Sequence, residues 1–313
     1  MTTDQATDRP TPATGPVHTL RRGTAVARIG ELAAVLREFS VDGVRYTETW
    51  ADDRLPPMGC GIVLVPWPNR VADGRWTYRG AAQQLDVTEV STGHASHGLL
   101  RNTAYVTVDF GDDVLEQRAD VYPQHGWPGT LQTWVRHELT GDGLAVTHGL
   151  INIGSVEVPF GVGAHPYLRV GDVPVDELTV TVAAASYAET DERMIPTGLH
   201  PVEGTEHDFR GGARVGDRLG HNHALTDLTP VGDRYEHRVT APDGRGVVLW
   251  ADASFGFAQV YVPPNFPGED GTRTGLAIEP MTCNADALNN GQGLRWLHPG
   301  ERWTGSWGLT PID

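Results

Sequence analysis

The sequence predicts an all-β fold, a large antiparallel β-supersandwich, and three observations support this prediction. Short apolar or alternating runs recur along the chain, and turn signals of the Asp-Gly kind separate them. No apolar stripe of helical period extends beyond about two turns, and no repeat of fixed period is visible. Many short strands with regular turns over most of the 313 residues favour a single sandwich domain.

Turn signals separate the predicted strands at regular intervals. Residues 35–41 have the broken alternation of a half-buried strand, and the hairpin turn Val41-Asp42-Gly43-Val44 ends them. The same turn chemistry recurs at 73–74, 141–143 and 243–244. Further strands are expected at 144–153, 178–184, 247–251 and 257–262. One short helix is expected at 286–290.

The N-terminal composition differs from the rest of the chain. Residues 1–18 are rich in Thr, Pro, Asp and Ala, which predicts a disordered tail before a single domain over residues 19–313. These first residues lack the charged and then apolar pattern of an export signal. We therefore expect a cytoplasmic protein.

Charge and cysteine content narrow the classes of partner. The formal net charge of -16 argues against nucleic acids and anionic membranes. No apolar run approaches the ~18 residues of a membrane span. Two isolated cysteines, Cys60 and Cys283, do not suggest a disulfide framework. We expect a monomer or homodimer with a small-molecule ligand.

Glu279 stands out because three apolar residues precede it and Pro280 follows it. A short apolar run ended by proline predicts a strand, since proline cannot donate to the ladder. Glu279 would then be the last strand residue, held against the core and directed into a cavity. Such a carboxylate either pairs with a cation or has a raised pKa that suits a general base.

The segment Pro66-Trp67-Pro68-Asn69-Arg70 is a rigid turn, because a proline on each side of Trp67 restricts the backbone. Asn69 and Arg70 are presented on this turn, and Arg70 can donate forked hydrogen bonds to ligand oxygens. Capping of loop carbonyls is the alternative use of this arginine. Trp67 could stack on a sugar ring, and packing in a large β core is its alternative use.

Two further segments contain histidines. His97 precedes a glycine, where backbone can come close to a ligand. His94 and His97 are three residues apart, but no cysteine or third ligand stands at zinc-site spacing, so we expect no metal. His165 follows a run of small residues and precedes Pro166. Histidine is the side chain best suited to shuttle a proton near neutral pH, and a structural role is the alternative.

Several signatures of other chemistries are missing from the sequence. It has no Gly-x-Ser-x-Gly elbow, no phosphate-binding Gly-rich loop with Lys and no dinucleotide fingerprint. Nucleophilic serine or cysteine chemistry therefore has no support, and we expect no cofactor. A glutamate, histidines and an arginine on an all-β frame suit proton transfer on a polyhydroxy ligand.

Four segments in order resemble the motifs of the aldose 1-epimerase (galactose mutarotase) family, namely residues 69–74, 97–99, 163–167 and 278–282. Residues 286–291 and 297–301 resemble the closing segment of its bacterial branch. Each motif alone is unspecific, but their order and intervals together are specific. The resemblance spans about residue 20 to the C-terminus.

This resemblance implies a β-supersandwich with a cleft open on one broad face. It implies that Glu279 is the general base and His165 the general acid, while His97 and Arg70 hold ring and hydroxyl oxygens of a sugar. One position departs from the family, where an Asp usually binds hydroxyl groups and Asn222 stands here. The Asn222 carbonyl oxygen can still accept a hydrogen bond, but it lacks the charge of an Asp. This departure therefore bears on which sugar is bound more than on the proton transfer.

The expected function is therefore interconversion of the α and β anomers of a free aldohexose such as glucose or galactose. Glu279 would take the proton of the C1 hydroxyl, and His165, entering as imidazolium, would protonate the ring oxygen. The open aldehyde would turn about its C1–C2 bond, and ring closure would then yield the other anomer.

Two other functions are open at this stage. An epimerase for a phosphorylated or other anionic hexose needs a basic cluster near the site, and three arginines lie near the motifs: Arg101, Arg169 and Arg295. A non-catalytic carbohydrate-binding module of the same fold is the other alternative. The presence of both Glu279 and His165 argues against it, because binding alone does not need an acid–base pair.

Overall fold

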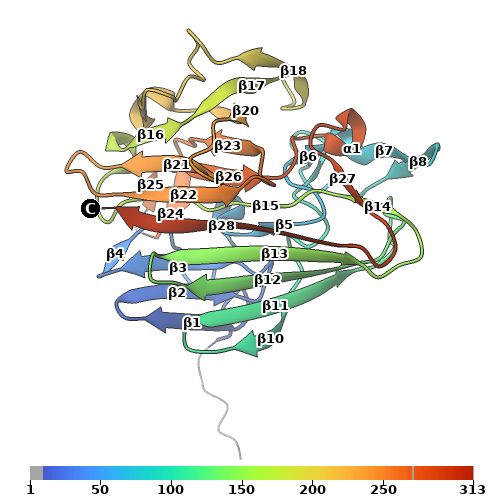
Figure 1. Cartoon of the computed structure of the whole chain (residues 1–313), viewed down its shortest axis with the longest axis horizontal. Coiled ribbons are helices and arrows are strands. Elements are labelled where there is room, and N and C mark those ends of the chain that lie inside the picture. Colours follow the sequence, from blue (N-terminus) through green and yellow to red (C-terminus); the bar gives the residue numbers. More distant parts are fainter. Residues whose placement is uncertain (1–9, 270, 313) are drawn as a thin grey trace, which may run out of the picture.

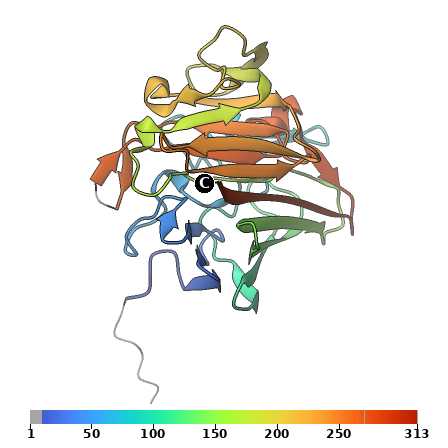
Figure 2. The same ribbon diagram turned by 60° about the vertical axis from the view of Figure 1, so that its left-hand side comes forward.

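The computed structural model describes residues 10–269 and 271–312, which form strands joined by turns and very little helix. This confirms the predicted all-β class. Two large antiparallel sheets dominate the molecule (Figure 1). In both views the segment around residues 190–215 caps one end, and the first strands lie towards the other end (Figure 2).

The larger sheet has nine strands and includes both partners of the predicted 141–143 and 243–244 hairpins. Its order is β10 (Val106–Phe110), β11 (Val114–Val121), β12 (Leu131–Leu139), β13 (Leu144–Asn152), β28 (Arg302–Ile312), β22 (Gly246–Asp252), β21 (Arg234–Thr240), β16 (Thr179–Val182) and β19 (Ala213–Arg214). Strict alternation of buried and half-buried residues along β12 shows that one face of this sheet packs on the core.

The second sheet has seven strands and contains the predicted base, and the predicted acid directly follows one of its strands. Its order is β18 (Pro196–Pro201), β17 (Ala184–Thr190), β20 (Asn222–Leu228), β23 (Phe257–Tyr261), β26 (Ala277–Met281), β15 (Gly163–Ala164) and β5 (Val63–Leu64). All five residues of β26 are buried, which agrees with an apolar strand in the middle of a sheet.

Smaller elements complete the fold. A four-stranded sheet contains β1 (Val17–Arg22), β2 (Ala25–Gly30), β3 (Leu36–Val41) and β4 (Val44–Arg45). Four two-stranded pairs are β6 (Arg70–Val71) with β9 (Ala95–Ser96), β7 (Arg75–Tyr78) with β8 (Ala81–Gln84), β14 (Val158–Phe160) with β27 (Arg295–Leu297), and β24 (Phe266–Gly268) with β25 (Gly271–Arg273). The helical turns are η1 (Pro57–Gly59), η2 (Ala72–Gly74), η3 (Val175–Glu177), η4 (Val215–Arg218) and α1 (Ala287–Asn290).

Several local predictions are confirmed. Strand β3 covers the predicted run, and Asp42 and Gly43 both have positive φ in the hairpin between β3 and β4. The one α-helix within residues 10–269 and 271–312 lies at the expected place, and both cysteines are buried free thiols. No helix among the described residues is long and apolar enough to cross a membrane.

The expected end of the strand at Pro280 is wrong. Strand β26 continues to Met281, which pairs with Phe257 of β23 and with Gly163 of β15. The proline is tolerated because β15 is only two residues long and pairs with β26 at Met281 alone, so little ladder is lost on that side. Glu279 therefore lies inside the strand, where its backbone is held more firmly than at an end.

The folded domain begins before residue 19, where the sequence placed its start. Residues 1–9 lie outside the described residues, but residues 10–18 belong to the folded domain. Thr14 is fully buried, and its hydroxyl accepts a hydrogen bond of 2.8 Å from the buried Arg37. Strand β1 begins at Val17, because its pairing with β2 starts there.

Candidate active site

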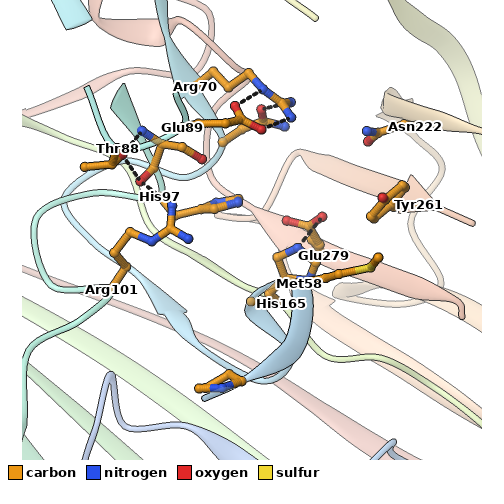
Figure 3. Close-up of a pocket in the computed structure, with 14 residues that line it drawn as sticks. Met58, Arg70, Thr88, Glu89, His97, Arg101, His165, Asn222, Tyr261 and Glu279 are labelled. Atoms are coloured by element: carbon orange, nitrogen blue, oxygen red, sulfur yellow. Dashed lines mark hydrogen bonds and ion pairs between the residues drawn. The ribbon is translucent and has the colours of Figure 1, made fainter. Parts of the chain in front are cut away.

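A cavity of about 350 Å³ opens beside the seven-stranded sheet (Figure 3). Its lining comes from segments far apart in the sequence: Pro56, Met58, Gly59, Asn69, Arg70, Thr88, Glu89, Ser96, His97, Arg101, His165, Asn222, Tyr261 and Glu279. Most of these side chains are polar or charged, which suits a hydroxyl-rich ligand more than an apolar one.

Strand register brings part of the lining onto one face of the sheet. Asn222 of β20 pairs with Tyr261 of β23, and Gln259 of β23 pairs with Glu279 of β26. Residues directly opposite each other, and residues two apart on one strand, share a face. The side chains of Asn222, Tyr261 and Glu279 therefore reach the same cavity from three neighbouring strands.

His165 directly follows β15, the strand beside β26. Its Nε2 atom lies 3.4 Å from the Oε1 atom of Glu279, and both side chains are about 95% buried or more. The ring of Tyr167 stacks on the imidazole, with centroids 5.2 Å apart and an angle of 4° between the planes. This stacking fixes the plane of the imidazole against Glu279.

Burial shifts the two groups in opposite directions. It raises the pKa of Glu279 to about 8, with a smaller opposing effect from Arg70. It lowers the pKa of His165 to about 3. The raised carboxyl pKa agrees with the predicted general base. Burial favours the neutral His165 ring, so the predicted imidazolium would have to form by proton transfer within the pair.

Arg70 is held by a carboxylate and not by loop carbonyls. Its Nε and Nη2 atoms donate to the two carboxylate oxygens of Glu89 at 2.6 and 2.9 Å, and Nη1 donates to Asn69 Oδ1 at 3.1 Å. The bidentate pair fixes the plane of the guanidinium. Hydrogen bonding and charge from Arg70 also lower the pKa of Glu89 against the effect of burial.

Hydrogen bonds continue from this pair across the cavity wall. Asn69 Nδ2 donates to Gln259 Oε1 at 3.2 Å, and Gln259 Nε2 donates to Asn222 Oδ1 at 2.7 Å. The amide of Asn222 is thus oriented by Gln259, a residue that does not itself line this cavity. Local sequence patterns gave no signal for Gln259, since its role depends on strand pairing.

Backbone strain places His97 in the lining. His97 and Asn69 both have positive φ, 62° and 55°, and the His97 N–H donates to the Asn69 carbonyl at 2.7 Å. A Cβ on the adjacent Gly98 would lie 2.0 Å from the Val65 carbonyl oxygen, so only glycine fits. Burial lowers the pKa of His97 well below its usual value, and its Nδ1 atom has no hydrogen-bond partner within the described residues.

Of the three arginines weighed as a basic cluster, one reaches the cavity. Arg101 lines it, and its Nη1 atom donates to the Ser96 carbonyl at 3.3 Å. Arg169 instead forms an ion pair with Glu48. Arg295 lies 6.0 Å above the ring of Trp303.

Trp67 does not line the cavity, which corrects its prediction as a stacking residue. Its side chain is 2% exposed, and its ring lies 5.9 Å from that of Trp127, which in turn contacts Trp76. The flanking prolines direct the indole into the core. Local contacts hold His94, whose Nδ1 atom accepts from the Asp73 N–H and whose Nε2 atom faces the Arg193 carbonyl, each at 3.0 Å.

The structure adds residues that sequence reasoning missed. Glu89, Thr88, Tyr261 and Met58 line the cavity but belong to no recognised motif. Tyr261 could have been suspected only from the pairing of β20 with β23, which the sequence does not specify.

Fold and site together define a class of protein, a β-supersandwich with a carboxyl–imidazole pair in a polar cavity. The family model described as aldose 1-epimerase matches residues 24–310. The chain therefore belongs to the aldose 1-epimerase family, as the motifs predicted.

Similar proteins support this assignment. The Escherichia coli protein YihR, described as uncharacterized, is 32% identical over 92% of this chain and 90% of its own length. Rat galactose mutarotase is 30% identical, over 52% of this chain and 48% of its own length. A GalM/aldose epimerase homologue from C. elegans has the same fold, with a TM-score of 0.83 at 16% identity, covering 95% of this chain and 99% of that one.

Proposed function

We propose that this chain is an aldose 1-epimerase that interconverts the α and β anomers of a free aldohexose without a cofactor. The observation that carries the proposal is the contact of 3.4 Å between His165 Nε2 and Glu279 Oε1 in a polar cavity. Anomer exchange needs one proton removed and one supplied a short distance apart, and this pair offers both functions.

Glu279 and His165 carry both proton transfers of this reaction. Proton transfer from Glu279 to His165 first gives a carboxylate beside an imidazolium. Glu279 then takes the proton of the C1 hydroxyl as the C1–O5 bond breaks, and its electron pair stays on O5. His165 protonates O5, which leaves an open aldehyde. After rotation about C1–C2, the same two groups in reversed roles close the ring to the other anomer.

Other lining residues hold the sugar in this scheme. His97 lines the cavity with a neutral imidazole, and a neutral imidazole can donate to or accept from a ligand oxygen. Glu89 fixes the plane of the Arg70 guanidinium, and the remaining N–H groups of Arg70 can donate to hydroxyl oxygens of the sugar. Asn222 supplies its amide from the facing strand, and Asn69 connects the two sides.

Polarimetry on freshly dissolved α-glucose and α-galactose tests the proposal. The wild type and a Glu203→Gln control, which changes an exposed carboxylate, should speed the approach to anomeric equilibrium. Glu279→Gln should lose about 10²–10⁴ of that rate. If the wild type accelerates neither sugar, free aldohexoses are not its substrates, and binding without turnover would identify a carbohydrate-binding module.

Arg101 favours a second candidate, an epimerase for a hexose that carries an anionic group. Arg70 is matched by Glu89, and the Glu279–His165 pair is neutral overall with one shared proton. Arg101 is also a cation of the cavity lining, and no carboxylate forms an ion pair with it among the described residues. The negative charge of Glu89 acts on the pKa of Arg101 only from a distance. An anionic substituent would pair with it at low energetic cost.

Substrate comparison separates the two candidates. Glucose and glucose 6-phosphate are assayed with the wild type and with Arg101→Gln. For an anionic substrate, glucose 6-phosphate should be the better substrate, and the variant should reverse that preference. For a free aldohexose, glucose should be preferred by both proteins, and the variant should change the ratio little.

A further inference from the structure

Three histidines gather on the opposite face of β20 from the sugar cavity. His221 and His223 flank Asn222, and side chains alternate between faces along an extended chain. Asn222 lines the cavity, so its two neighbours project to the other face. His207 reaches the same place from the segment between β18 and β19. One ring nitrogen from each of the three histidines lies within 4.8 Å of the others.

The spacing of two of these nitrogens suits a shared ligand. His207 Nδ1 lies 3.1 Å from His221 Nε2. Two nitrogens bound to one tetrahedral zinc ion at about 2.0–2.1 Å are ~3.4 Å apart. The two nitrogens would need to separate by a few tenths of an ångström, with the rings turned so that both lone pairs face one ion and the hydrogen of His207 carried on its other nitrogen.

The surroundings orient the rings as a metal site requires. His221 Nδ1 lies 3.0 Å from the Val260 carbonyl oxygen, so this nitrogen carries the hydrogen and Nε2 presents its lone pair. Tyr187 stacks on His207 with centroids 3.9 Å apart. His223 Nδ1 is buried and finds no hydrogen-bond partner among residues that the structure describes. This nitrogen therefore has no competing hydrogen bond to lose when a ligand binds.

The charges around the cluster also fit metal coordination. Glu206 and Glu189 exert a negative field on His207 and His223, which partly compensates a divalent charge.

We propose that His207, His221 and His223 bind a divalent transition metal ion of the zinc class at a structural site outside the sugar cavity. The site ties the 202–212 segment to β20, and water or an acidic side chain would complete four-coordination. The sequence predicted no metal, because the three ligands are separated by spacings of fourteen and two residues and only the fold brings them together.

Zinc titration of the chelator-treated full chain tests the site, with calorimetry for affinity and thermal unfolding for stability. The wild type should bind one ion per chain, and its midpoint of unfolding should rise with zinc. His207→Gln and His223→Gln should each weaken binding more than tenfold and lose the shift. His200→Gln should behave like the wild type, because this exposed histidine contacts Glu189 nearby without joining the cluster.

Cobalt substitution supplies a second, spectroscopic readout of the site. The wild type with Co²⁺ should show the visible absorption of a four-coordinate site, and His223→Gln should lose it. Absence of one-to-one binding in the wild type, or binding unchanged in both His207→Gln and His223→Gln, would overturn the proposal. Neither result depends on epimerase activity.

Discussion

His165 Nε2 lies 3.4 Å from Glu279 Oε1, and burial favours the neutral form of both side chains. Together the two groups hold one proton at neutral pH. Moving that proton from the carboxyl to the imidazole gives the ion pair that ring opening requires, without exchange with solvent. Total charge is unchanged by this transfer, which limits the energetic penalty of burial.

The pH profile of activity follows from this shared proton. Because the pKa of Glu279 is raised to about 8, the pair loses its proton as pH rises through that value. We expect kcat/KM to be level at neutral pH and to fall about tenfold per pH unit above 8. The infrared band of a protonated carboxyl, absent from Glu279→Gln, should titrate with the same midpoint. A profile that rises through pH 8 would contradict a one-proton active pair.

Glu279→Gln should lose activity and should become more stable than the wild type as pH rises. The folded state holds the Glu279 proton more tightly than the unfolded state, so the free energy of unfolding falls as pH rises between the ordinary glutamate pKa of 4.5 and about 8. The neutral amide removes this dependence on pH. Relative to wild type, the variant should gain stability as pH increases across that window, measured by urea unfolding at pH 5, 7 and 9. If the difference in free energy of unfolding between the two proteins stays constant with pH, the pKa of the Glu279 carboxyl is not raised.

Glu89 should act through the orientation of Arg70. Glu89→Gln replaces a bidentate carboxylate with a neutral amide, so the guanidinium loses its fixed plane and gains an unmatched charge. We expect KM to rise about tenfold, equal to ~1.4 kcal/mol of binding, with a smaller change in kcat. Asp208→Asn is the matched control, since it breaks a similar ion pair with Arg210 at the surface. A large loss of kcat with unchanged KM would count against this positioning role.

The sequence was informative where function depends on local motifs and less so where it depends on strand pairing. Glu279 and His165 stand in recognisable segments, and both line the cavity. Tyr261 and Gln259 take part only because β23 pairs with β20 and β26 in a particular register. The error at Trp67 has the same origin, because a rigid turn predicts exposure without telling which side faces the core.

Gly98 holds the backbone that presents His97 to the cavity. Gly98 has a φ of 76°, and an added Cβ would lie 2.0 Å from the Val65 carbonyl oxygen. Because backbone cannot move aside as a side chain can, Gly98→Ala should lower the free energy of unfolding by at least about 2 kcal/mol. Gly80→Ala is the matched control, with a φ of 81° and no atom within 4 Å of the added Cβ.

For Gly80→Ala we expect a loss of about 1 kcal/mol, from backbone conformation alone. Urea unfolding at constant m gives both values. The Gly98 variant should also raise KM, since the clash displaces His97 from the lining, whereas the control should not. Equal losses for the two alanines would show that the contact with Val65 relaxes freely and that the segment around His97 is not rigidly held.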